Sequence, residues 1–160
     1  MKTKVNSLLF KPDIEQADAR WDAYFNGDII KRPIVCVSSP KKGSEGYKPH
    51  GGNYYNQVYG NIDSLIDNAL EDAENTYYGG ELIPAYYPSL GPDEIACYCG
   101  AKLEFQKGSM HTNWCVPFVK DWKDVYLDIQ EESPYWKRIL AIYKRASERM
   151  SGKMLLYHVD

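Results

Sequence analysis

Three cysteines and one histidine that could bind a metal lie within a short stretch of the chain, namely Cys97, Cys99, His111 and Cys115. Three thiolates and one imidazole would suit tetrahedral Zn²⁺. The C-x-C and H-x₃-C pairs do not have a standard zinc spacing, however, and a free cysteine commonly packs as a small hydrophobic residue. We therefore predict buried cysteines and no metal, with the zinc site as the alternative.

His158 and Asp160 are the candidate catalytic residues, because a histidine close to a carboxylate can transfer protons. They follow an apolar run at the end of the sequence, and strand alternation would place them on the same side. The alternative is a solvated, frayed Asp160 with His158 packed beneath it.

Candidate ligand contacts begin in the segment Ser38–Gly60, which is rich in Ser, Lys, Gly, Tyr, Asn and Pro. A loop of that length inside a compact domain is usually functional or mobile. Lys41 and Lys42 could attract a carboxylate or phosphate, although solvated lysines are the commoner case. Tyr86, Tyr87 and Trp114 could stack on a flat ring, and their alternative role is packing.

The elements that would position these residues follow from hydrophobic spacing and capping residues. Asp13 and Gly27 bound an amphipathic helix that carries Ile14, Ala17, Trp21, Tyr24 and Phe25. Asn61 caps a second helix, whose apolar face runs from Ile62 to Ala73 and which Gly79-Gly80 ends. The apolar run Ile34–Val37 predicts a central parallel strand buried on both faces. Leu82–Tyr87 predicts the next strand.

The second half of the sequence continues with a short helix after Gly91-Pro92 and two weaker strands, Leu103–Phe105 and Asn113–Val119, in a small antiparallel excursion. Ser133-Pro134 begins the longest helix, Ser151-Gly152 ends it, and Met154–Val159 predicts a last buried strand. This order of strands and helices is typical of a parallel α/β sheet with right-handed crossovers.

Composition excludes several classes of protein. The 160 residues, of which 44% are hydrophobic, predict one domain over residues 1–160. A net charge of −3 with interspersed charges excludes nucleic acid as a partner, and no apolar stretch is long enough for a membrane. The four cysteines lie in apolar or aromatic surroundings, which predicts a reduced, cytoplasmic protein without structural disulfides.

Several segments resemble the uroporphyrinogen decarboxylase superfamily, including its decarboxylase-like and corrinoid methyltransferase-like members. The resemblance covers nearly the whole chain and depends on the order and spacing of motifs that are weak individually. They are Arg20–Asp28, Arg32–Val35, Tyr87–Pro92, Gly100–Phe105, Thr112–Trp114 and Asp121-Trp122.

The resemblance implies a (β/α)₈ TIM barrel with its ligand at the carboxyl ends of the strands. A whole barrel needs roughly 250 residues, so we expect a partial barrel, the amino-terminal half with parallel strands and flanking helices. It would contribute to a pocket for a corrinoid, a tetrapyrrole or a methylated small molecule. No cofactor is expected within this chain alone, and a corrinoid or tetrapyrrole would bind in the full barrel.

The departures from the family pattern disfavour porphyrinogen decarboxylation. Ser38 or Ser39 stands where decarboxylases carry an arginine for substrate carboxylates, and Tyr87-Pro88-Ser89 replaces an acidic residue. We keep Ser38 and Ser39 as ligand-binding candidates and favour a methyltransferase-like role. The expected partner is a missing carboxyl-terminal half or a second copy of the chain. The alternative function is a non-catalytic, truncated or oligomerising module.

Overall fold

The computed structural model describes residues 7–157, which form two compact units. Within the described chain, the first unit contains residues 7–50, 67–87 and 147–157, and the second contains residues 51–66 and 88–146. Helices α3 and α5 contribute residues to both units. No helix among the described residues is long and apolar enough to span a membrane.

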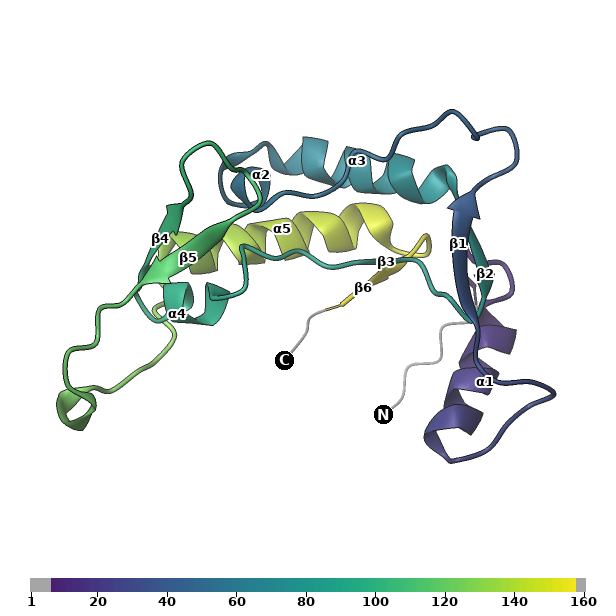
Figure 1. The fold of residues 1–160 in the computed structure, drawn as a ribbon, viewed down its shortest axis with the longest axis horizontal. Helices are drawn as coiled ribbons and strands as arrows, with labels where there is room; N and C mark the ends of the chain where they lie inside the picture. The colour runs from purple at the N-terminus through teal and green to yellow at the C-terminus, as the bar shows by residue number, and fades with distance from the viewer. Residues whose placement is uncertain (1–6, 158–160) are drawn as a thin grey trace. The chain divides into compact units, whose positions relative to one another are not determined.

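The predicted partial TIM barrel is wrong. The described strands form three separate two-stranded sheets, and two of these sheets are antiparallel. Strand β1 pairs with β2, β4 pairs with β5, and the parallel sheet consists of β3 and β6 (Figure 1). The sheets therefore have too few parallel strands to form a barrel wall in the part of the chain that the structure describes.

The first helix forms as predicted, over Ile14–Phe25 (α1). Its apolar spacing buries Ile14 and Ala17 against the first unit. Asp13 does not cap the helix with its side chain, because its carboxylate lies 3.0 Å from the Nζ of Lys11 instead.

Strand β1 (Cys36–Pro40) pairs antiparallel with β2 (Thr76–Gly80), with Cys36 opposite Gly80. All five β1 residues are exposed, so the prediction of a buried central strand is wrong. A short apolar run does not reveal how its strand will pair. The pairing depends on Gly80, where a Cβ would lie 2.0 Å from the carbonyl oxygen of Val35.

The two longest helices form where the sequence predicts them, but α3 ends before the predicted stop at Gly79-Gly80, because Thr76–Gly80 forms strand β2 instead. Helix α3 covers Ile62–Glu74, and the side chain of Asn61 caps it by accepting the Ser64 N–H at 3.0 Å. Helix α5 covers Pro134–Met150. Two ion pairs join α3 to α5. In the second unit, Asp63 lies 2.7 Å from Arg145, and in the first unit Asp67 pairs with Arg149.

Strands β3 (Ala85–Tyr86) and β6 (Leu155–Leu156) form the parallel sheet of the first unit. Both are shorter than the predicted strands at 82–87 and 154–159. The N–H of Leu155 binds the carbonyl of Pro84 at 2.9 Å, and the N–H of Tyr157 binds the carbonyl of Tyr86 at 3.2 Å.

The second unit contains the predicted antiparallel excursion, with β4 (Lys102–Phe105) paired to β5 (Asn113–Val116) (Figure 1). The short helix after Gly91-Pro92 is α4 (Glu94–Tyr98), and a 3-10 turn, η1, covers Trp122–Asp124.

Helix α2 (Tyr54–Tyr59) was not predicted, because its six residues are too few to show helical periodicity. Asn53 caps its start by accepting the Asn56 N–H at 2.8 Å, and Arg138 donates to the carbonyls of Gln57 and Gly60 at its end.

Each unit has its own set of buried apolar side chains. In the first unit they are Leu8, Ile14, Ala17, Ala73, Met150 and Met154. In the second they are Ile66, Leu90, Cys97, Ala101, Leu103, Ile139, Ile142 and Ala146.

Candidate functional site

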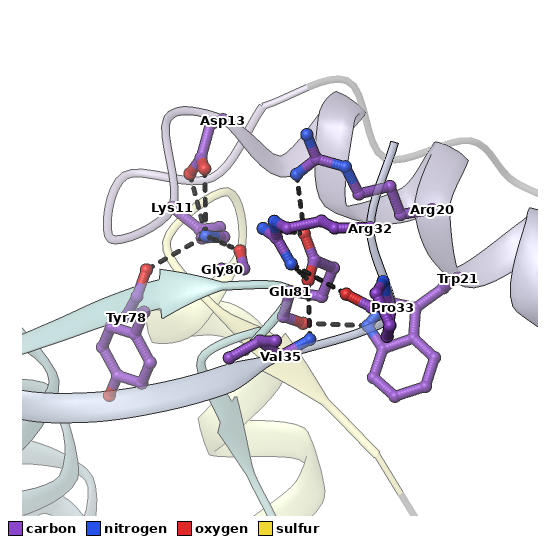
Figure 2. A network of polar contacts seen from close by, with 10 residues as sticks. All are labelled: Lys11, Asp13, Arg20, Trp21, Arg32, Pro33, Val35, Tyr78, Gly80 and Glu81. Atoms are coloured by element: carbon purple, nitrogen blue, oxygen red, sulfur yellow. Dashed lines mark hydrogen bonds and ion pairs between the residues drawn. The ribbon is translucent and has the colours of Figure 1, made fainter. Parts of the chain in front are cut away.

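The buried carboxylate of Glu81 is the centre of a network of polar contacts (Figure 2). Glu81 follows β2 directly and is 0% exposed. Its Oε1 accepts hydrogen bonds from Arg20 at 2.7 Å and Arg32 at 2.8 Å. Its Oε2 accepts from Arg32 at 2.7 Å and from the N–H of Val35 at 2.9 Å. Four donors therefore surround one carboxylate.

The network keeps Glu81 ionised. Hydrogen bonds from Arg32 are the largest cause, and together with those from Val35 and Arg20 they outweigh burial and lower the pKa of Glu81 from 4.5 to about 2. A carboxylate with both oxygens occupied and such a low pKa is a poor proton donor or acceptor near neutral pH. The backbone carbonyl of Glu81 also accepts the indole N–H of Trp21 at 2.8 Å. We therefore assign Glu81 a structural role.

Lys11 is a second buried charge in the same unit, with 1% of its surface exposed. Its ammonium donates to the carbonyls of Tyr78 at 3.0 Å and Gly80 at 2.7 Å, and to Asp13 at 3.1 Å (Figure 2). An ammonium group has three protons, and three acceptors surround this one. Lys11 thus holds β2 in place and is not available to a ligand.

The predicted ligand residues Ser38 and Ser39 lie on the exposed strand β1 and line a pocket of about 260 Å³. Ser44, Tyr47 and Asn75 also line it. The hydroxyl of Ser44 lies 2.7 Å from Oδ1 of Asn75. The pocket is thus small and polar, and the loop after β1 forms one of its walls.

Lys41 lines a different pocket of the first unit, of about 400 Å³, together with Phe10, Asp13, Tyr77 and Tyr78. Lys42 is exposed and lines neither of these two pockets. The structure therefore does not bring Lys41 and Lys42 together with Ser38 and Ser39 around one ligand.

The three aromatic residues that were predicted to stack on a flat ring lie in different units, Tyr86 and Tyr87 in the first and Trp114 in the second. Tyr86 is buried in β3, and Tyr87 stacks on Tyr157 with ring centroids 5.3 Å apart. Trp114 lies on β5 in the second unit and is 42% exposed. Packing within the chain thus occupies Tyr86 and Tyr87, whereas Trp114 remains partly exposed to solvent.

The second unit contains an apolar groove of about 520 Å³ between α4, the end of β5 and η1, which we call the Trp122 groove. Its apolar lining includes Ile95, Ala101, Val116, Phe118, Val119 and Trp122, and its polar groups include Asp93 and Cys115. Trp122 is 72% exposed and Ile95 is 65% exposed, so the groove is open to solvent. Large apolar side chains exposed together commonly mark a binding surface.

The cysteines do not form the alternative zinc site in the structure. Cys97 and Cys115 are in contact, but no group of three or more His, Cys, Asp or Glu side chains within residues 7–157 is placed to hold a metal ion. His111 lies exposed near the β4–β5 loop, where its backbone N–H binds the hydroxyl of Ser109.

His158 and Asp160, the predicted catalytic residues, lie outside the described residues. The histidine at position 50 is described, and its Nε2 lies 3.0 Å from a carboxylate oxygen of Glu71. The N–H of His50 and the hydroxyl of Tyr47 both donate to Oδ1 of Asp72, at 2.9 and 2.6 Å. Burial is the largest cause that raises the pKa of Tyr47, followed by its bond to Asp72.

Comparisons with protein-family models, with curated proteins and with solved structures find no match for this chain. The functional interpretation therefore depends on the residues and their geometry.

Sequence reasoning missed the Glu81 network and the Trp122 groove. One signal was present for the network, since Glu81 is a single acidic residue between Gly79-Gly80 and the apolar segment that follows. The groove had a weaker signal, the apolar run from Val116 to Val119 interrupted by Pro117.

Proposed function

We propose that the chain contributes a binding surface for a small molecule of the corrinoid, tetrapyrrole or methylated class, and that the Trp122 groove is this surface. The observation that carries the proposal is an open, mostly apolar groove of about 520 Å³ with exposed aromatic rings. Small-molecule sites typically have volumes of roughly 300–1,000 Å³ and few polar groups.

The groove offers chemistry that suits these ligands. Phe118 and Trp122 are 46% and 72% exposed, and their rings can stack on a flat macrocycle. Trp122 can also attract a methylated ammonium group through its ring face. Asp93 adds one carboxylate, whose Oδ2 accepts the N–H of Cys115 at 3.3 Å. A carboxylate at the rim would pair with a cationic or N–H group of the ligand.

The other polar centres support this choice by elimination. The donors and acceptors around Glu81 and Lys11 bind one another, which leaves these charges little capacity for a ligand. The pocket at Ser38 and Ser39, at about 260 Å³, is half the size of the groove. A macrocycle placed in the open groove would still expose one side, so further walls from a partner would complete the site.

The test is titration of the chain with three separate probes: hydroxocobalamin, a water-soluble free-base porphyrin and tetramethylammonium. Absorbance follows the two macrocycles, and calorimetry follows the ammonium salt. We expect saturable binding of at least one probe, weakened roughly tenfold by Trp122→Ala, because losing one aromatic contact costs about 1.4 kcal/mol.

Tyr126→Ala is the matched control, since Tyr126 is an aromatic residue of the same unit, is 89% exposed and does not line the groove. It should leave the affinity unchanged. The proposal fails if none of the three probes binds saturably, or if Trp122→Ala and Tyr126→Ala weaken binding equally.

A second candidate function is self-association through the first unit. Strand β1 is exposed along its whole length, and Val35 and Val37 are each 46% exposed. An exposed edge strand in a two-stranded sheet, with exposed valines at its start, is a surface on which another strand can pair.

Light scattering after size-exclusion chromatography tests this second candidate. A discrete dimer that Val37→Lys converts to a monomer would support it, because a lysine on an edge strand opposes pairing. Gln106→Lys, an exposed position after β4 in the other unit, is the control and should leave the dimer intact. A monomeric parent chain would rule out self-association.

A further inference from the structure

Two of the four cysteines lie unusually close together in the second unit. Cys97 on α4 and Cys115 on β5 have their sulfur atoms 2.7 Å apart. Two carbon atoms in optimal contact lie about 3.5 to 4.0 Å apart, and sulfur is the larger atom. The thiols are therefore closer than ordinary packing would place them, although the two cysteines are 18 positions apart in the sequence.

The hydrogen bonds around the two cysteines show which of the two thiols donates its S–H to the other. The S–H of Cys115 donates to the carbonyl of Asp93 at 3.0 Å, so its sulfur is left to accept the S–H of Cys97. The backbone of Cys97 is held as well, since its carbonyl accepts the hydroxyl of Ser133 at 3.1 Å. Both sulfurs are therefore held in place by short contacts.

The two thiols differ in their access to solvent. Cys97 is 0% exposed, whereas Cys115 is half-buried and lines the open Trp122 groove. A small oxidant that enters the groove reaches Cys115 first. Among the thiols that the structure describes, this is the pair in contact, and Cys36 is exposed on β1 in the other unit.

We propose that Cys97 and Cys115 are a redox modification site, a dithiol that a low-molecular-weight disulfide converts reversibly into an intramolecular disulfide. The proposal is independent of the proposed ligand-binding function. It is compatible with a chain that lacks permanent disulfides, because the bond would form only under oxidising conditions.

The reaction proceeds in two exchanges. The Cys115 thiolate attacks one sulfur of the small disulfide, whose S–S bond breaks, and one small thiol leaves with a proton. Cys97 then loses its proton and attacks the Cys115 sulfur of the mixed disulfide, which releases the second small thiol. The two cysteines are oxidised, and the small disulfide is reduced to two thiols. Burial raises the pKa of Cys97 and of Cys115, so little thiolate is present near neutral pH and the reaction rate should increase as the pH is raised.

The experiment equilibrates the full chain with excess oxidised glutathione and counts free thiols after denaturation. We expect two of the four thiols to disappear, the mass to fall by two hydrogen atoms, and dithiothreitol to restore both thiols. The cross-link should raise the Tm by roughly 5 to 10 °C, since it closes a loop of moderate length.

Substitutions identify the partners, because Cys97 and Cys99 fall in the same tryptic peptide and mapping alone would not separate them. Cys115→Ser should abolish the internal cross-link, and Cys99→Ser and Cys36→Ser should retain it. Cys97→Ser alters a fully buried position, so the test depends on the other three variants and the parent chain.

Two results would overturn the proposal. One is a parent chain that keeps four thiols or carries only glutathione adducts after equilibration. The other is a cross-link that survives Cys115→Ser or disappears in Cys99→Ser, since either result assigns the reactivity to a different pair.

Discussion

The Glu81 network and the Trp122 groove use their side chains in opposite ways. Around Glu81, a fully buried carboxylate receives four hydrogen bonds from Arg20, Arg32 and Val35. In the groove, Ile95 and Trp122 are more than half exposed. The network satisfies its polar groups within the chain, whereas the groove leaves apolar area available for another molecule.

This difference in burial indicates that the Glu81 network stabilises the fold and that the Trp122 groove is available for binding. A buried charge must be paired, because its desolvation costs several kcal/mol. Removing one partner of the network therefore damages the fold. An exposed aromatic side chain contributes little to folding, and its removal should affect only what binds there.

The largest effect is expected for Glu81→Gln. The amide removes the negative charge that Arg20 and Arg32 share, and its NH₂ group opposes one of their N–H donors. We expect the free energy of unfolding to fall by about 3 to 5 kcal/mol, as for other broken buried ion pairs. Urea denaturation measures it.

Glu104→Gln is the control for this loss. Glu104 forms an ion pair with Lys102 at 3.0 Å, but both side chains are exposed. Its removal should change the free energy of unfolding by less than about 1 kcal/mol. Equal losses in the two variants would show that the Glu81 network does not stabilise the fold in the way its burial indicates.

The contribution of the same network should also appear in the pH dependence of the free energy of unfolding, with a somewhat smaller effect than that of Glu81→Gln. The pKa of Glu81 is about 2 in the folded chain and 4.5 for an ordinary glutamate. The unfolded chain thus takes up a proton at this residue between pH 4.5 and 2 while the folded chain does not. The contribution of Glu81 is present above pH 4.5 and is lost as the pH falls towards 2.

Denaturation at a series of pH values measures this dependence. Glu81→Gln should show a shallower fall in the free energy of unfolding between pH 4.5 and 2 than the parent chain. Identical slopes would mean that other carboxylates dominate acid unfolding.

Asn113→Ala tests a neutral polar contact in the second unit. The side-chain amide of Asn113 donates to the carbonyl of Leu90 at 2.6 Å, and both residues are buried. Losing this donor leaves a buried carbonyl unsatisfied, so we expect a loss of about 1 to 3 kcal/mol. Asn26→Ala, which removes an exposed amide-to-carbonyl bond at 2.8 Å, should cost clearly less in the same denaturation experiment.

Trp122→Ala should have the smallest effect on stability. Trp122 is 72% exposed, so we expect the free energy of unfolding to change by no more than about 0.5 kcal/mol. Thermal and urea denaturation measure it. A loss comparable to that of Asn113→Ala would show that the groove wall is part of the folding core, and it would remove the contrast between the two regions.

Long-range strand pairing was the part of the fold that sequence reasoning predicted wrongly. Ile34–Val37 contains the β-branched residues of a strand, yet nothing in those residues reveals an antiparallel partner more than forty positions away. The pairing depends on Gly80, which allows the close approach of the Val35 carbonyl, and on Lys11 and Glu81, which bind the backbone of Gly80 and of Val35 at the same end of the sheet.

The candidate site was predicted only in fragments. Ser38 and Ser39 line one pocket and Lys41 lines another, and Tyr87 stacks on Tyr157. The residues of the Trp122 groove come from α4, β5 and η1, and periodicity within one element does not predict which elements lie together.

By itself, the sequence determined the local elements of this protein. Helices α1, α3 and α5 and the β4–β5 hairpin follow from apolar spacing, from the Asn61 cap and from turn residues, all of which act over a few positions. Only the tertiary structure decided that Glu81 meets two arginines and that Cys97 meets Cys115, because contacts between distant segments depend on how every intervening element packs.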